Sequence, residues 1–321
     1  MTVRTVRLDG FVRLKSPLSH IGETISNTSY LVEDSVLQQD GNLEKVFCYS
    51  GNAWRGQIRD LMSSYMLDAL GRPRLSLDAF HLLYSGGRMG GSQVTDLAAA
   101  RAIKATIPIV SLLGGGVGNQ ILEGKARFGS AYPLCRQAMP VLPSHTHAIA
   151  EGIDYADLTM MKEYSRRDDA KISSIAAYLP QDEGADEGAK KRRADPDGVA
   201  DQMRIRAEFV SPGTTLHSWI VLQDVSDVEI GCLVSGLHCF SRSPHIGGKA
   251  ASGHGLVDLS YTMKDLDTGE VVDFLSVRDG ETALMPPARE AKAAYDQHLR
   301  TIYDNMLADS SSKIVQLLGA A

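Results

Sequence analysis

The sequence lacks any apolar run long enough to cross a membrane, and its N-terminal residues lack the apolar core of a secretory signal. Its four cysteines form no C-x-x-C pair and lie in apolar segments, which is typical of reduced core cysteines. The G-x-x-x-x-G-K-[ST] nucleotide loop and the G-x-S-x-G nucleophile turn are also missing. We therefore expect a cytoplasmic, soluble protein outside the P-loop and α/β-hydrolase classes.

Basic residues are in the minority, because 33 Lys and Arg face 39 Asp and Glu, which gives a net charge of −6. Their distribution is uneven: residues 1–140 carry 15 basic and 11 acidic residues, and the remainder carries 18 and 28. Phosphate binding depends on local charge, so this composition still allows a basic groove. It argues against a promiscuous, purely electrostatic binder of nucleic acid.

The most informative segment present is SGNAWRGQIRD, Ser50–Asp60, which follows a predicted strand and begins a predicted helix. A helix start presents unpaired backbone N–H groups and a positive dipole end, which favour a phosphate. Arg55 and Arg59 fall on one face of this helix, and the planar guanidinium suits phosphate well. The residues alone leave two interpretations open, a phosphate cradle and a helix start with two solvated arginines.

Hydrophobic periodicity predicts an α+β sheet of the split β-α-β kind, elaborated by insertions. The segments with strand character are Val3–Leu14, Glu44–Tyr49, the β-branched run Ile107–Leu113, Arg127–Pro133, Met203–Val210, Leu216–Leu222 and Leu256–Met263. The predicted helices are Ala53–Ala69, Leu75–Leu83, Ser92–Ile103, a helix capped by Ser226 and Glu229 that reaches Phe240, and Pro287–Leu318.

Between residues 155 and 206 the apolar pattern is lost, and the chain becomes charged and glycine-rich. Such a composition buries too little apolar surface to order itself, so we expect a protruding, partly mobile insertion. Its basic run, KKRR at Lys190–Arg193, is either a solvated tip or an auxiliary contact to nucleic acid.

Two glycine-rich loops are candidate ligand-binding sites. GGGVGNQ, Gly114–Gln120, has Ile121 where a dinucleotide-binding loop needs its third glycine, which disfavours that function. IGGKAASGHG, Ile246–Gly255, would let a ligand approach the backbone with Lys249 supplying charge, or it is only a flexible connection. The histidines lack a third partner at a recognisable spacing, so no metal site is expected.

Taken in order, five segments resemble the backbone subunits of class 1 CRISPR effector complexes, which belong to the RAMP superfamily. They are the first strand with SPLSHIGE, SGNAWRGQIRD, LLGGGVGNQILEGKARFGSAYP, FVSPGTTLHSWIVLQDVSDVEIGCLVSGL and IGGKAASGHGLVDL. Within this resemblance, the length, the W-R-G-Q-I-R-D variant and the extended acidic insertion favour a type IV system, with a type I system as the alternative. The resemblance implies one domain over 1–321, an RRM-like or ferredoxin-like palm with inserted helical segments. It also implies a protruding β-hairpin thumb at 155–206 and a C-terminal helical segment at 287–321.

In function, the resemblance implies a subunit that stacks head to tail in several copies along a guide RNA (crRNA). It would present the guide to a target nucleic acid, together with other effector subunits and without a membrane partner or cofactor. Some backbone subunits of this superfamily cleave target RNA with an aspartate in the first loop. Here that loop has no aspartate, and Glu23 is its only acid, so we expect no catalytic residue. The residues implied to bind RNA are Ser16, His20, Gly22, Gly51, Asn52, Arg55, Arg59, Arg166, Arg167, Lys171, Gly248 and Lys249.

Two alternatives remain at this point. One is a metal-independent endoribonuclease of the same superfamily, which would process the guide precursor with His20 or His254 as general base. The other is an unrelated cytosolic α+β enzyme that binds a phosphorylated metabolite with its two glycine-rich loops.

Overall fold

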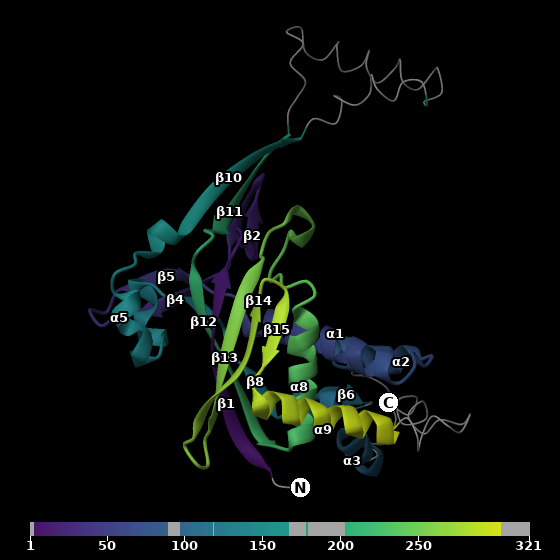
Figure 1. Ribbon diagram of the computed structural model, residues 1–321. Coiled ribbons are helices and arrows are strands. Elements are labelled where there is room, and N and C mark those ends of the chain that lie inside the picture. Colours follow the sequence, from purple (N-terminus) through teal and green to yellow (C-terminus); the bar gives the residue numbers. More distant parts are fainter. Residues whose placement is uncertain (1–2, 89–96, 118, 167–177, 179–202, 303–321) are drawn as a thin grey trace.

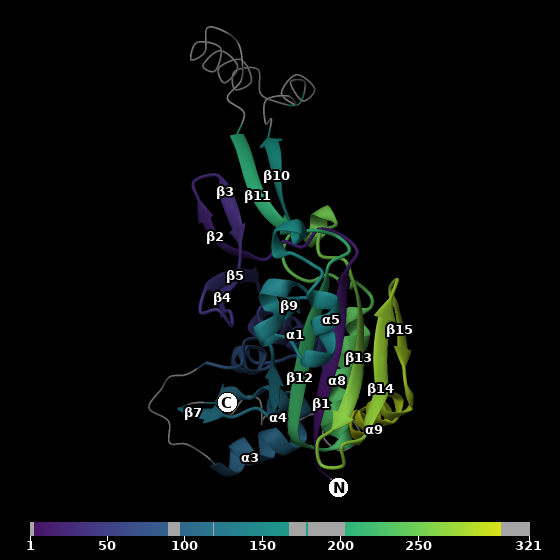
Figure 2. The same cartoon turned by 90° about the vertical axis from the view of Figure 1, so that its left-hand side faces the viewer.

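The computed structural model describes residues 3–88, 97–117, 119–166, 178 and 203–302. Within these residues the central sheet has seven strands, and four of them form its antiparallel middle in the order β13-β1-β12-β8 (Figures 1 and 2). These elements are β1 (Arg4–Leu14), β8 (Ala126–Phe128), β12 (Thr215–Val225) and β13 (Val257–Asp265). Helix α1 (Gly51–Ala69) lies between β1 and β8 in the chain, and α8 (Asp227–Phe240) joins β12 to β13. This is the split β-α-β order of a ferredoxin-like palm, so the predicted α+β fold class is confirmed.

Other elements extend or decorate this palm. They are β2 (Ile21–Ile25), β3 (Thr28–Leu31), β4 (Glu33–Leu37), β5 (Leu43–Phe47), α2 (Leu77–Phe80), η1 (His81–Ser85), α3 (Leu97–Thr106), α4 (Pro108–Leu113), β6 (Gly115–Val117), β7 (Gln120–Leu122), β9 (Tyr132–Pro133), η2 (Arg136–Val141), η3 (Ser144–Thr146), α5 (His147–Ala150), η4 (Tyr155–Leu158), β10 (Thr159–Arg166), β11 (Met203–Val210), η7 (Ala250–Ser252), β14 (Val271–Arg278), β15 (Glu281–Leu284) and α9 (Pro286–Ile302).

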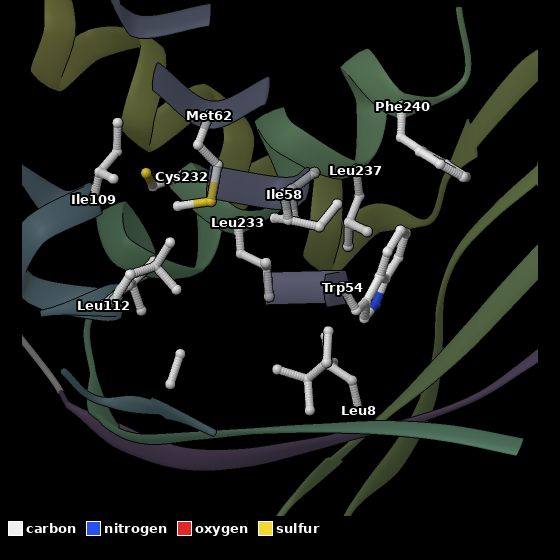
Figure 3. Packing of buried hydrophobic residues seen from close by; sticks show 14 of the residues in the cluster. Leu8, Trp54, Ile58, Met62, Ile109, Leu112, Cys232, Leu233, Leu237 and Phe240 are labelled. Carbon is white, nitrogen blue, oxygen red and sulfur yellow. The ribbon is translucent and has the colours of Figure 1, made fainter. Parts of the chain in front are cut away.

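The main core lies between the sheet and the helices α1 and α8 (Figure 3). Along β1 every second side chain is buried, so Leu8 faces the helices while its neighbours face the other side. Leu8, Ile58 and Leu237 are fully buried there. Trp54 also points into the core and donates a hydrogen bond from Nε1 to Tyr261 Oη over 3.2 Å. This residue of the SGNAWRGQIRD motif therefore holds α1 on β13.

The start of α8 is fixed by the predicted capping box. Ser226 Oγ accepts from the Glu229 N–H at 3.4 Å, and the Ser226 N–H donates to Glu229 Oε2 at 2.8 Å. Lys125 and Ser111 donate to the other carboxylate oxygen at 2.7 and 2.6 Å. Burial raises the pKa of the Glu229 carboxyl, but these hydrogen bonds outweigh it and leave the pKa below its ordinary value.

A second sheet rises above the palm, in the order β10-β11-β3-β2 (Figures 1 and 2). Strands β10 and β11 pair antiparallel over their full length, and β11 pairs parallel with β3 at Arg206–Thr28 and Ala207–Ser29. Composition alone indicated no regular structure before Met203, which is wrong for the eight residues of β10. The boundaries predicted for the thumb, 155–206, stay a prediction because most of its interior lies outside the described residues.

Two predictions of local structure are corrected. The β-branched run at Ile107–Leu113 forms the fully buried helix α4 instead of a strand, because Pro108 at its first turn presets a helical φ. The helix predicted at Leu75–Leu83 is divided into the short α2 and the wider turn η1. Of the helix predicted at 92–103, the described part is α3, and of the C-terminal helical segment it is α9.

All four cysteines are unpaired, and Cys48, Cys135 and Cys232 are buried. Among the helices of the described residues, none has both the length and the apolar content needed to cross a lipid bilayer.

Candidate nucleic-acid interface

The predicted strand-to-helix junction is present at the start of α1. Ser50 is the N-cap, and its Oγ accepts the Ala53 N–H at 3.1 Å. Gly51 begins the helix against β8, where a Cβ atom would lie 2.3 Å from the Phe128 carbonyl oxygen. Only glycine allows this approach, which fixes the helix start beside the sheet. Asn52 is exposed on the first turn.

The two arginines of α1 lie on one face, as predicted, but in different environments. Arg59 is only 5% exposed and donates to the carbonyl oxygens of Leu82, Leu113 and Gly114 at 3.3, 3.0 and 3.3 Å. Arg55 is half-buried and also donates to the Leu113 carbonyl. Both guanidinium groups thus reach the C-terminal end of α4, whose carbonyl groups lack partners within that helix.

Within the described residues, neither arginine forms an ion pair with a carboxylate. Burial lowers the pKa of Arg59 to about 10; the charge of Arg55 adds to the effect and that of Asp60 opposes it. The interpretation of two solvated arginines is therefore wrong for Arg59, which is a buried cation held by backbone carbonyls. Phosphate binding by these two guanidinium groups remains a prediction.

Arg55 and Arg59 line a cleft of about 720 Å³ between α1, the end of α4 and the β6–β7 hairpin. Glycine backbone forms much of its wall, and Tyr84 and Arg127 also line it. Its side chains include three arginines and a single carboxylate, that of Glu123, which pairs with Arg127 at 3.3 Å. The cleft therefore carries positive charge that the surrounding described carboxylates do not neutralise.

On the other side of the α1 start, the two predicted loops meet. The Gly248 N–H donates to the Ser19 carbonyl oxygen at 2.6 Å, which joins the IGGKAASGHG loop to SPLSHIGE. Gly247 has a φ of 72°, and a Cβ atom there would lie 2.3 Å from the same oxygen. Ser16 Oγ accepts the Leu256 N–H at 2.8 Å, which closes the far end of this loop pair.

Lys249 connects this loop pair to the base of the β10–β11 hairpin. Its ammonium nitrogen lies 5.0 Å from the ring centre of Phe209 and 5.4 Å from that of Tyr164, within the range of a cation–π interaction. The ring of His254 packs against Phe209 with 4.9 Å between centres. Lys162 approaches the same phenylalanine at 5.5 Å. Two cations thus gather around the buried ring of Phe209 and the exposed ring of Tyr164, where the hairpin leaves the palm.

His20 lies between the two regions. Its Nε2 accepts the Ser50 N–H at 3.4 Å, and its ring packs on Tyr49 with 4.7 Å between centres. Burial lowers its pKa, so the ring is neutral at pH 7, as suits a position beside the positive end of α1. The SPLSHIGE loop is thereby attached to the helix start that carries the arginines.

The remaining predicted residues are placed less closely. Gly22 is exposed on β2, in the upper sheet rather than at the loop junction. Arg166 ends β10, and its side chain is outside the described part, as are Arg167 and Lys171. The structure therefore brings together Ser16, His20, Gly51, Asn52, Arg55, Arg59, Gly248 and Lys249 around the start of α1.

Sequence reasoning missed Tyr84, Arg127, Tyr164 and Phe209. Tyr164 lies two residues before Arg166, which the resemblance implied to bind RNA, so its alternation with Lys162 along a strand was the available signal. No local signal marks Tyr84, which reaches the cleft only through the packing of η1 on α1. Over the described ranges, no three His, Cys, Asp or Glu side chains come together in a way that could hold a metal ion.

Comparison with solved structures finds a similar chain in a structure described as "Type IV-B CRISPR Complex". The TM-score is 0.55 and the sequence identity 18%, over 80% of this chain and 90% of that chain. At this identity the likeness establishes the fold alone. No protein-family model matches the sequence. No curated protein matches it either.

Proposed function

We propose that this chain is a guide-RNA-binding backbone subunit of a class 1 CRISPR effector complex, of type IV. Several copies stack head to tail along the guide, which pairs with the target nucleic acid, and other effector subunits complete the assembly. The chain itself is non-catalytic and needs no metal or cofactor. A heterologous contact of this kind does not close, so it produces an open helical filament.

The observation that carries this proposal is that three regions adjoin around the start of α1: the hairpin base, the pair of loops and the cleft. Each of them offers cations or exposed backbone groups. Lys249 and Lys162 lie at the hairpin base, Gly248 and His20 follow, and Arg55 faces the cleft beyond. Exposed backbone and cations bind the sugar–phosphate chain without reading its sequence, as a carrier of variable guides requires. The shared fold with a chain of a type IV-B CRISPR complex supports the same function.

The test is co-purification with RNA. The chain is expressed beside a repeat array and analysed for bound small RNA, for the ratio of absorbance at 260 and 280 nm, and for assembly size. We expect RNA in large assemblies for the unaltered chain and clearly less RNA per protomer for Lys249→Glu. Arg278→Glu is the matched control, because Arg278 is an exposed cation at the end of β14, away from the interface. RNA-free monomers of the unaltered chain in these cells would refute the function.

The alternative is a metal-independent endoribonuclease that processes the guide precursor. A general base needs a free lone pair, whereas the Nε2 lone pair of His20 accepts the Ser50 amide. His254 is the better candidate, because its buried Nε2 has no hydrogen-bond partner among the described residues. Cleavage of precursor RNA in chelator, lost in His254→Gln, would favour this alternative over a non-catalytic subunit.

A further inference from the structure

The cleft beneath α1 has the composition of a nucleotide site, beyond a surface that only follows a phosphate chain. Its cationic wall is formed by Arg55, Arg59 and Arg127. Arg59 is 5% exposed, and its guanidinium donates to carbonyl oxygens, which are neutral acceptors and do not cancel its charge. The charge of Asp60 offsets only part of the cost of burying Arg59, since the pKa of Arg59 stays lowered, and an anion in the cleft would offset more of that cost.

The lining of the cleft also includes an aromatic side chain. Tyr84 lines it, and its ring stacks on that of Phe80 with 5.1 Å between centres and 24° between planes. Phe80 is 44% exposed, and Tyr84 Oη lies 3.2 Å from Ser64 Oγ, which fixes the tyrosine from the α1 side. A pre-ordered stack of two rings beside a cationic pocket is the arrangement on which a nucleobase adds a further layer.

The glycines complete the cleft. A Cβ atom at Gly114 would lie 2.3 Å from the Leu122 carbonyl oxygen, and one at Gly124 would lie 2.5 Å from that of Leu112. The two chain segments therefore pack backbone on backbone, and the wall facing the cleft is formed by peptide groups. With about 720 Å³ available, the space suits one nucleotide rather than a phosphate alone.

We propose that this cleft binds a single nucleoside phosphate, with the phosphate at Arg55 and the first turn of α1 and the base stacked on Tyr84. The nucleotide is either one unit of a bound RNA, in which case the inference rests on the proposed function, or a free mononucleotide. Tyr84 and Arg127 are then ligand residues in addition to those implied by the α1 motif.

Photo-crosslinking tests the assignment directly. The full chain, freed of bound RNA, is irradiated in one arm with 4-thiouridine 5′-monophosphate and in the other with a short RNA that contains one 4-thiouridine. Trypsin cuts after Arg74 and Arg88, so Tyr84 lies in a single peptide of residues 75–88. We expect crosslinking to this peptide in at least one arm, with competition by uridine monophosphate at least tenfold stronger than by uridine.

Two variants test the stacking on Tyr84 and the phosphate contact of Arg55 separately. Tyr84→Leu should remove the crosslink and weaken binding about tenfold, the effect of losing one base–aromatic stack. Arg55→Gln should weaken the binding of uridine monophosphate but not that of uridine. Tyr30→Leu and Arg278→Gln are the matched controls, since both residues are exposed and lie outside the cleft, and they should bind as the unaltered chain. An unmodified 75–88 peptide in both arms, or unchanged crosslinking of Tyr84→Leu, would overturn the proposal.

The two arms also separate this inference from the proposed function. Crosslinking by RNA alone assigns the cleft to one nucleotide of the guide, whereas crosslinking by the monophosphate alone assigns it to a free nucleotide. If RNA co-purifies but the 75–88 peptide stays unmodified, the nucleotide site is refuted while the RNA-binding function stands. If the monophosphate crosslinks and no RNA co-purifies, the site stands and the RNA-binding function is refuted.

Discussion

Replacing Arg59 with methionine separates a structural role for this arginine from a role in binding. Methionine keeps the buried stem of the side chain but loses three hydrogen bonds to the carbonyl oxygens of Leu82, Leu113 and Gly114. A hydrogen bond from a charged donor is worth about 1.5–3 kcal/mol. Water in the cleft can replace the lost donor at Leu113 and Gly114, and the variant no longer has to bury a charge. Both effects reduce the loss, so we expect the free energy of unfolding to fall by about 3 kcal/mol.

For a chain of 321 residues, a loss of this size lowers Tm by roughly 5 °C, because the entropy of unfolding is about 2.1 cal/mol/K per residue. Differential scanning calorimetry of RNA-free protein measures the shift directly. Arg55→Gln, which changes a half-buried group on the same face, should lower Tm by no more than about 2 °C. If Arg59→Met kept the Tm of the unaltered chain but lost bound RNA, Arg59 would be a ligand residue and the structural assignment would be wrong.

Two further predictions concern folding. Glu229 has a lowered pKa in the folded chain, so its stabilisation is complete above its ordinary value of 4.5 and is lost as the pH falls below it. The Tm of the unaltered chain should therefore fall more between pH 6 and pH 3.5 than that of Glu229→Gln, and equal slopes would contradict the role of the carboxylate. Gly247→Ala places a methyl group 2.3 Å from the Ser19 carbonyl oxygen at a positive φ, so we expect a loss of about 1–3 kcal/mol in urea unfolding. Gly269 also has a positive φ, but no atom lies within 4 Å of its Cβ position, so Gly269→Ala should lose only the free energy due to backbone strain. An equal loss in both variants would show that the Ser19 contact is unimportant.

Signals that act within a few residues were sufficient to predict the elements that carry them. The capping box at Ser226 and Glu229, the strand-to-helix junction at Ser50–Asp60 and the alternation along β1 each depend on neighbours in sequence, and the structure has all three. The order of these elements was enough to predict the split β-α-β palm. Helix α4 was missed because an apolar run of seven residues, Ile107–Leu113, fits a strand and a buried helix equally well.

The environment of the interface residues could not be read from the sequence, because their partners are distant. The spacing of Arg55 and Arg59 predicts a shared face, but the carbonyl groups that receive Arg59 come from residues 82–114. Likewise, Lys249 meets Phe209 and Tyr164 only because β10 and β11 pair beside the glycine-rich loop. Such contacts depend on tertiary packing, for which no periodic pattern exists.

The parallel pairing of β11 with β3 has a mechanical consequence. A hairpin attached only by its own two strands would swing freely, whereas this one shares a sheet with the segment that leads into His20 and on to Ser50. The hydrogen bonds between Leu18 and Val210, in both directions at 3.0 Å, provide a second attachment on the same path. The hairpin is consequently anchored to the first turn of α1 through a path of hydrogen bonds that includes Leu18 and His20.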